Sequence, residues 1–141
     1  MAQEKSCGAV LFKRHKEGAK YLLLHYQAGH WDFPKGNQEK NETEEKTVAR
    51  EIKEETGIED AEFVKGFKET IKYFYKKGEE TVYKEVAFYL VESSTESVIL
   101  SSEHIGYVWV SYEHGIKKLT FNTSKELLRK ANQFIYKNVN G

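Results

Sequence analysis

Residues 36–58 read GNQEKNETEEKTVAREIKEETGI, and this segment predicts one helix over residues 42–56. Asn41 is expected as the N-cap with Glu44 three residues later, and carboxylates in the first turn suit the positive end of the helix dipole. Gly57 follows the last periodic residues and is expected to end the helix, because glycine adopts the left-handed conformation without strain.

The expected helix carries an acidic face beside an apolar one. At about 100° per residue, Glu51, Glu54 and Glu55 share one arc of roughly 100°, next to an arc that contains Val48 and Ile52. Like charges four residues apart destabilise a helix by roughly 0.2–0.5 kcal/mol, so this face makes sense if it binds a divalent cation. A plain solvated face is the alternative in a chain with 31% charged residues.

The spacing of these residues follows a longer pattern. Gly36 is followed by five residues and Glu42, and then by seven residues and the run REIKEETGI at 50–58. The segment resembles the Nudix box, G-x5-E-x7-R-E-U-x-E-E-x-G-U with U aliphatic, at every specified position. Nine specified positions over 23 residues make the match far more specific than a short glycine motif.

The resemblance implies an α/β (α+β) protein with the Nudix fold, a mixed β-sheet sandwiched between helices. It implies hydrolysis of a phosphoanhydride bond in a nucleoside polyphosphate, with Mg²⁺ or Mn²⁺ offsetting the phosphate charge. The implied metal ligands are the Gly36 carbonyl, Glu51, Glu54, Glu55 and Glu103. The implied catalytic residues are Arg50, which orients the box carboxylates, Glu54, Glu55 and Glu103.

Glu103 lies outside the box, in SSEHIGYVWV just before an apolar strand. Some members of the family activate water with a glutamate outside the box, so Glu103 is expected either to complete the metal site or to act as the base. A plain loop carboxylate is the alternative.

The sequence around the box carries a narrower resemblance. HWDFPKG at 30–36, GFKETIKYFY at 66–75 and the lysine at 84 are similar to asymmetrical diadenosine tetraphosphate hydrolases of the animal and archaeal type. That resemblance implies cleavage of diadenosine tetraphosphate by water into ATP and AMP. The residues implied to bind substrate are His30, Lys35 and Lys84 at the phosphates, and Tyr73 and Phe121 around an adenine. Ordinary loop, strand and core roles are the alternatives for these five.

Other functions within the family stay open. The chain could be an RNA 5′ pyrophosphohydrolase, or a pyrophosphatase for oxidised nucleoside triphosphates or nucleotide sugars. A non-catalytic nucleotide-sensing module on the same fold is an alternative of another class, although such modules can lose box carboxylates that are all present here. Basic and acidic residues number 22 each, so no stable nucleic-acid partner is expected.

Length and composition set further bounds. The chain has 141 residues, which is room for a single domain over residues 1–141. Cys7 is the lone cysteine, so an intramolecular disulfide and a thiolate-rich metal site are excluded. No apolar run approaches the roughly 20 residues of a membrane span, so a cytoplasmic protein without a membrane partner is expected. The oligomeric state stays open.

The remaining elements follow from apolar periodicity and turn residues. A hairpin with Gly18 in its turn is expected to precede a loop at 27–35, and the last helix is expected to start at a capping box of Thr123 and Glu126. The expected strands are 7–12, 21–25, 61–75 with a break near Gly66, 82–91 and 107–110.

Overall fold

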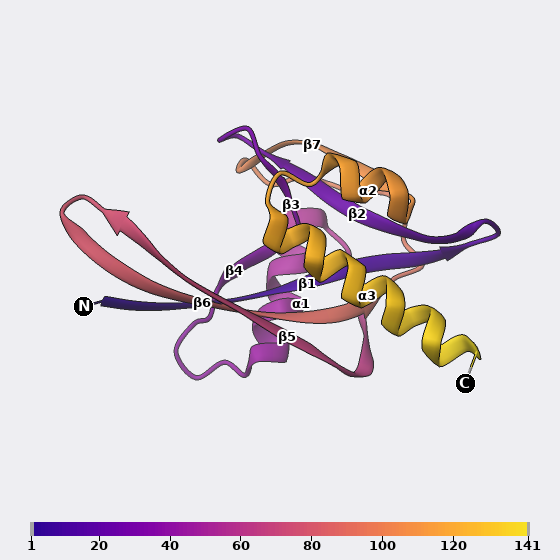
Figure 1. Ribbon diagram of the computed structural model, residues 1–141, viewed down its shortest axis with the longest axis horizontal. Helices are drawn as coiled ribbons and strands as arrows, with labels where there is room; N and C mark the ends of the chain where they lie inside the picture. Colours follow the sequence, from indigo (N-terminus) through magenta and orange to yellow (C-terminus); the bar gives the residue numbers. More distant parts are fainter. Residues whose placement is uncertain (1, 141) are drawn as a thin grey trace.

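The computed structural model describes the backbone of residues 2–140 and the side chains of residues 2–137. A mixed sheet is covered by helices on both faces (Figure 1). In order, the elements are β1 Ala2–His15, β2 Gly18–Tyr26, β3 Trp31–Asp32, β4 Lys35–Asn37, α1 Glu44–Thr56, β5 Glu62–Lys77, β6 Glu80–Glu92, β7 His104–Val110, α2 Tyr112–Lys118 and α3 Asn122–Asn140.

The sheet is mixed because one of its central pairings is parallel. Strand order is β3-β2-β1-β6-β5, with β4 also pairing with β1 and β7 with β2. β1 and β6 run parallel from the pair Ala2 and Val82 to the pair Phe12 and Glu92, whereas the other pairings are antiparallel. The parallel pair requires a crossover, and the segment from β4 through α1 to β5 lies between these two strands in the chain.

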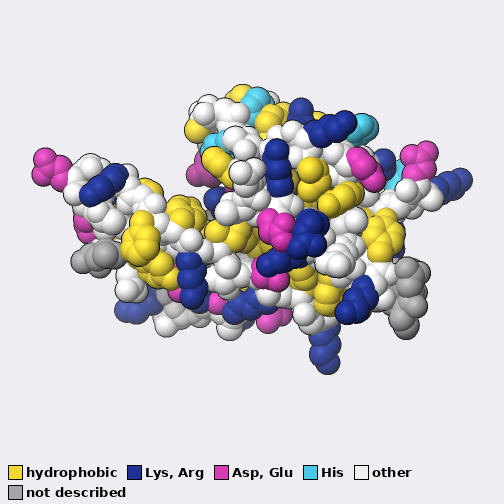
Figure 2. Space-filling model, in the orientation of Figure 1, with side chains coloured by type: hydrophobic (Ala, Val, Ile, Leu, Met, Phe, Trp, Pro, Cys, Tyr) yellow, Lys and Arg dark blue, Asp and Glu magenta, His cyan; other side chains and the backbone are white. Residues whose placement is uncertain are grey.

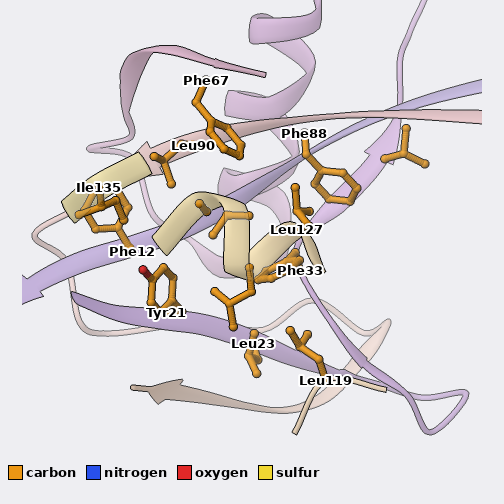
Figure 3. Close-up of a cluster of buried hydrophobic side chains, with 14 residues drawn as sticks. Phe12, Tyr21, Leu23, Phe33, Phe67, Phe88, Leu90, Leu119, Leu127 and Ile135 are labelled. Atoms are coloured by element: carbon orange, nitrogen blue, oxygen red, sulfur yellow. The ribbon is translucent and has the colours of Figure 1, made fainter. Parts of the chain in front are cut away.

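Alternate residues of β1 supply two separate cores, one on each face of the sheet. Val10 and Phe12 belong to a cluster beneath α3, which also contains Leu128 (Figure 3). Ala9 and Leu11 face the other way and belong to the cluster that includes Val48 and Ile52 of α1. In Figure 1, α3 crosses in front of the sheet and α1 lies behind it, so the expected α/β/α arrangement is confirmed.

The hairpin and the broken strand are also as expected. Gly18 turns the β1–β2 hairpin with a φ of 117°, and Phe12 pairs with Tyr21. The pairing of β5 with β6 shifts register between Phe63 and Lys68, around Gly66, whose φ is 99°. Glycine is favoured at such positive φ values because it has no Cβ.

The predicted start of the box helix was wrong. Asn41 has a φ of 72°, whereas an N-cap residue needs an extended backbone. Thr43 takes that role, with a φ of −75° and its hydroxyl accepting the N–H of Lys46. The helix therefore begins at Glu44, and Gly57 ends it with a φ of 75° as expected.

Three further predictions of secondary structure need correction. Thr123 lies inside α3, which begins at Asn122, and the carboxylate of Glu126 accepts hydrogen bonds from Arg129, so the expected capping box is absent. The loop expected at 27–35 contains β3, and α2 was not expected at all.

Within the part of the chain that the structure describes, no helix combines the length and apolar character that a membrane span requires.

Candidate active site

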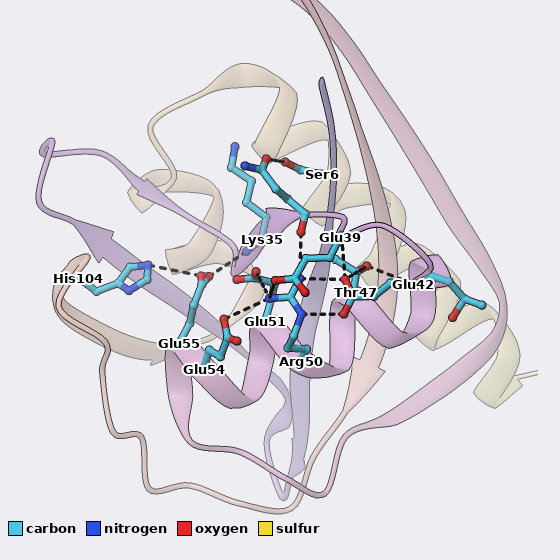
Figure 4. A network of polar contacts seen from close by, with 12 residues as sticks. Ser6, Lys35, Glu39, Glu42, Thr47, Arg50, Glu51, Glu54, Glu55 and His104 are labelled. Carbon is cyan, nitrogen blue, oxygen red and sulfur yellow. Dashed lines mark hydrogen bonds and ion pairs between the residues drawn. The ribbon is translucent and has the colours of Figure 1, made fainter. Parts of the chain in front are cut away.

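Arg50 donates hydrogen bonds to three carboxylates of the box and holds them in one cluster (Figure 4). Its Nε donates to Glu42 at 2.7 Å, and its Nη1 donates to Glu51 at 2.8 Å and to Glu54 at 3.2 Å. Its Nη2 donates to the backbone carbonyl of Asn37 at 3.0 Å and again to Glu42. These five residues are called the Arg50 cluster below.

The charges of the Arg50 cluster stabilise one another. The Arg50 hydrogen bond, helped by the N–H of Glu39 and the hydroxyl of Thr47, lowers the pKa of Glu42 to about 2. The same contact raises the pKa of Arg50. Burial raises the pKa of Glu51, and the hydrogen bond from Arg50 opposes that rise. Folding alone therefore holds Glu42 ionised and aims the carboxylates of Glu51 and Glu54.

Gly36 is required next to this cluster because a side chain there would displace Glu51. A Cβ on Gly36 would lie 2.0 Å from the carboxyl carbon of Glu51. The backbone of β4 is held against β1 by the pairing of Gly36 with Cys7, so it cannot easily retreat. The Glu51 carboxylate thus packs directly on the backbone whose carbonyl is a predicted metal ligand.

Glu55 occupies a different environment one turn further along α1. It is 2% exposed, and its Oε1 accepts the backbone N–H of Lys35 at 3.2 Å. Its Oε2 faces His104 Nε2 at 3.8 Å, and neither atom has a hydrogen-bond partner among the described residues. Burial, reinforced by the nearby charge of Glu51, raises the pKa of Glu55 to about 8. We call Glu55 and His104 the Glu55–His104 corner.

Glu103 approaches this corner from the loop before β7. It is exposed, its carbonyl accepts the N–H of Gln27 at 3.1 Å, and the ligand atoms of Glu55, Glu103 and His104 all lie within 4.8 Å of one another. Carboxylate oxygens are the ligands that hard divalent cations prefer, and an unpaired buried oxygen is costly unless something binds it. The residues present therefore fit a divalent cation.

Three of the predicted substrate residues line one pocket of about 280 Å³. Lys35, Tyr73 and Phe121 lie on its walls, and Val86 and Phe88 of β6 make it largely apolar. Tyr73 is 39% exposed and Phe121 45% exposed, so both rings have free surface. Figure 2 shows hydrophobic side chains gathered on the protruding end of β5 and β6, at the left of the view.

The other two predicted substrate residues lie beside this pocket. The Nζ of Lys84 lies 3.1 Å from Asn37 Oδ1 and 3.4 Å from a carboxylate oxygen of Glu4. Lys84 is also the β6 partner of Tyr73, so it is placed between the pocket and the Arg50 cluster. The ring of His30 stacks on Tyr26 with centroids 4.5 Å apart and lies 5.4 Å from the ring of Phe121.

Sequence reasoning missed His104, although it follows Glu103 directly. Its side chain is fully buried, with its ring edge-on to Tyr26 at 4.5 Å. A lone histidine in a polar loop carries no signal of burial in the sequence. Its importance becomes visible only when β7 pairs with β2 and brings it against α1.

An acidic helix, a lysine at the start of β4 and an apolar pocket together form a site with the features of a protein that binds a cation and a phosphorylated ligand. Comparison with known proteins specifies that class: the NUDIX domain model matches residues 3–131, and the chain belongs to the Nudix family. The family and fold expected from the box are thereby confirmed. Nudix hydrolases use divalent cations, in agreement with the acidic site described above.

Three relatives are informative. The chain is 32% identical to the asymmetrical bis(5′-nucleosyl)-tetraphosphatase of Mus musculus, in an alignment that covers 93% of this chain and 95% of the relative. It is similar to the structure of a C. elegans Ap4A hydrolase binary complex, with a TM-score of 0.82, 30% identity and coverage of 94% and 98%. It is 28% identical to the RNA pyrophosphohydrolase of Sulfurovum sp. (strain NBC37-1), with coverage of 89% and 88%.

Proposed function

We propose that this chain is an asymmetrical bis(5′-nucleosyl)-tetraphosphatase that hydrolyses diadenosine tetraphosphate to ATP and AMP with Mg²⁺ or Mn²⁺. The observation that carries the proposal is the position of Lys35. Its backbone N–H holds Glu55 of the box, while the same residue lines the pocket that Tyr73 and Phe121 flank. A nucleoside in that pocket would direct its phosphates toward the box. The names of the mouse and C. elegans relatives support the same substrate.

The pocket suits a flat base. Tyr73 comes from β5 and Phe121 from the segment before α3, and both offer exposed ring surface to one apolar pocket. Stacking on two rings holds a base without reading its edge, and each aromatic contributes about 1–3 kcal/mol per base. We assign base binding to these two residues.

Two lysines and a histidine follow the path from the pocket to the box. Lys35 lines the pocket, and Lys84 is held by Asn37, whose own carbonyl accepts from Arg50. His30 lies next to Phe121. Charge-assisted hydrogen bonds to phosphate oxygens are among the strongest that proteins make, so we assign phosphate binding to Lys35 and Lys84. Burial lowers the pKa of His30, and we assign its imidazole a further hydrogen bond to phosphate.

The box supplies the remaining groups. The ligands that would hold Mg²⁺ or Mn²⁺ are the Gly36 carbonyl, Glu51, Glu54, Glu55 and Glu103, and the bound cation offsets charge on the phosphates. Arg50 orients Glu51 and Glu54 through its hydrogen bonds. During hydrolysis the water oxygen bonds to phosphorus, the anhydride oxygen leaves, and a carboxylate takes the water proton. We assign that last role to Glu55 or Glu103, whose carboxylates lie beside each other at the site.

The decisive assay incubates the purified protein with diadenosine tetraphosphate and Mg²⁺ and separates the nucleotide products. Equal amounts of ATP and AMP are expected, and a chelator should stop their formation. Two ADP molecules per substrate, or no turnover beside rapid cleavage of another nucleotide, would refute the proposal. Glu103→Gln separates the two candidate bases, because unchanged turnover would remove Glu103 from the reaction.

Two adjacent aromatic residues provide a matched test of the pocket. Tyr73→Ala should raise KM about tenfold with a smaller effect on kcat, since stacking contributes mainly to binding. Phe74→Ala removes a ring that is 62% exposed but does not line the pocket, so KM should not change. Equal effects of the two substitutions would mean that the base binds elsewhere.

Hydrolysis of 5′-triphosphorylated RNA is the second candidate, favoured by the similarity to the Sulfurovum RNA pyrophosphohydrolase. Values of kcat/KM for a short triphosphorylated RNA and for diadenosine tetraphosphate, measured side by side, distinguish the two. A higher value for the RNA would make the dinucleotide a secondary substrate.

A further inference from the structure

The Glu55–His104 corner contains an unusual pair of unsatisfied atoms. His104 Nε2 and Glu55 Oε2 lie 3.8 Å apart, too far for a hydrogen bond between them. Both are buried, and neither has another partner among the described residues. Leaving a buried polar atom unpaired costs about 1–3 kcal/mol, and here two such atoms face each other. A third group between them would satisfy both at once.

The other ring nitrogen of His104 is already occupied. Nδ1 lies 3.0 Å from the hydroxyl oxygen of Ser101, and that oxygen can accept an N–H. With the proton on Nδ1, Nε2 presents a lone pair toward the Glu55 carboxylate. A metal-binding histidine typically has this arrangement, in which one nitrogen donates to a fixed acceptor and the other is free to bind the ion.

Glu103 completes a set of three donors. Its ligand atom lies within 4.8 Å of those of Glu55 and His104, and its exposed side chain has room to adjust. Ser101 supports this geometry twice, because its hydroxyl oxygen also lies 3.3 Å from the backbone N–H of Glu103. One serine thus holds both the imidazole ring and the loop that carries the third donor.

We propose that His104 Nε2 binds a divalent cation together with Glu55 and Glu103, so that the site offers one nitrogen beside carboxylate oxygens. The proposal rests on the cation site of the proposed function and adds a ligand of different chemistry to it. An all-oxygen site favours Mg²⁺ or Mn²⁺, whereas an imidazole increases the relative affinity for Co²⁺, Ni²⁺ and Zn²⁺. This position therefore prefers transition metals to Mg²⁺, unlike the carboxylates of Glu51 and Glu54.

The test uses the whole protein without nucleotide, so that it does not depend on which substrate the enzyme cleaves. Mn²⁺ is added to the wild-type protein, and pulsed electron paramagnetic resonance measures its coupling to nitrogen. Labelling of histidine with ¹⁵N identifies an imidazole ligand in the wild-type chain itself, so the result does not depend on whether a variant folds. His104→Gln is then compared with His114→Gln, which changes an exposed histidine of α2.

We expect histidine nitrogen coupling in the wild type and in His114→Gln, and its loss in His104→Gln. Affinity for Ni²⁺ or Co²⁺ should fall at least about tenfold in His104→Gln, with Mg²⁺ affinity changed less than about threefold. Bound Mn²⁺ without histidine coupling, coupling that survives in His104→Gln, or no Mn²⁺ binding at all would overturn the proposal. The first of these outcomes would indicate that the cation is bound by carboxylates and that His104 is not a ligand.

Discussion

The Arg50 cluster and the Glu55–His104 corner meet on the same short helix, yet folding treats them differently. In the cluster, one guanidinium donates to three carboxylates and a backbone carbonyl. In the corner, a carboxylate oxygen and an imidazole nitrogen face each other without a partner among the described residues. The cluster is complete as folded, whereas the corner keeps two unpaired atoms that the proposed cation would satisfy.

The box therefore places the same type of side chain, a glutamate carboxylate, in two different environments. The carboxylates of Glu42, Glu51 and Glu54 are fixed in direction by their hydrogen bonds to Arg50. The carboxylate of Glu55 is dehydrated by burial and keeps one oxygen available. Residues with strongly shifted pKa values next to a charged cluster are a common property of active sites, and the structure shows how 13 residues of helix provide both kinds.

The largest expected effect comes from neutralising the corner. Glu55→Gln keeps the shape of the side chain but removes a proposed cation ligand and proton acceptor, so kcat should fall about 10³-fold. Turnover of diadenosine tetraphosphate is the measurement. Glu45→Gln, on the exposed side of the same helix, is the control and should turn over normally. A Glu55→Gln enzyme with near wild-type kcat would mean that the corner has no part in the reaction.

Glu55→Gln should also raise the free energy of unfolding at pH 8 when a chelator keeps divalent cations away. The pKa of Glu55 is raised from 4.5 to about 8 in the folded protein, so its contribution to stability is full below pH 4.5 and is lost as the pH rises toward 8. The free energy of unfolding of the wild type at pH 8 should therefore lie about 4 kcal/mol below its value at pH 4.5 from this group. Glu55→Gln should lack that component, and added divalent cation should stabilise the wild type more at pH 8 than at pH 5. Urea titrations at pH 5 and pH 8 measure the free energy of unfolding of both proteins. The same change with pH in the wild type and in Glu55→Gln would contradict the prediction.

The contrast between the two regions also shows how far the sequence could predict the site. The spacing of Glu51, Glu54 and Glu55 places them on one helix face whatever surrounds the helix, so the acidic ridge was predictable. Their separation into two environments was not, because it depends on Lys35 from β4 and His104 from β7. Contacts between distant elements have no local signature in the chain.

The errors in the fold have a similar cause. Asn41 and Thr43 are both good N-cap residues, and local propensity does not separate them. The choice is made by the turn before the helix, in which the N–H of Glu42 bonds to the carbonyl of Glu39 and the N–H of Glu39 bonds back to the Glu42 carboxylate. That turn leaves Asn41 in a left-handed conformation and leaves Glu42 free to accept from Arg50.

The second largest effect is expected from dismantling the cluster. Arg50→Ala leaves three carboxylates without their shared donor, so kcat should fall about 10²-fold and the free energy of unfolding by about 2 kcal/mol. Arg50→Lys keeps the charge but not the planar fork, and should recover part of the stability and less of the activity. Arg129→Ala, which breaks an exposed pair with Glu126, should change neither quantity measurably. Turnover and urea unfolding of the three variants are the measurements, and full activity in Arg50→Ala would show that the cluster does not orient the carboxylates.

The smallest effect should come from Gly36→Ala, which perturbs the cluster without removing a charged group. The new Cβ would lie 2.0–2.3 Å from the carboxylate atoms of Glu51, and the flexible end of that side chain can move where the β4 backbone cannot. Glu51 should therefore leave its position at a stability cost of about 1 kcal/mol, while kcat falls about tenfold because a misaligned ligand weakens catalysis. Gly106→Ala in β7 is the matched control, since its nearest neighbour lies at an ordinary 3.7 Å. If Gly36→Ala instead lost several kcal/mol of stability along with its activity, the glycine would be required for folding rather than for the direction of Glu51. Activity would then depend less on the exact position of the Glu51 carboxylate than the hydrogen bonds of the cluster indicate.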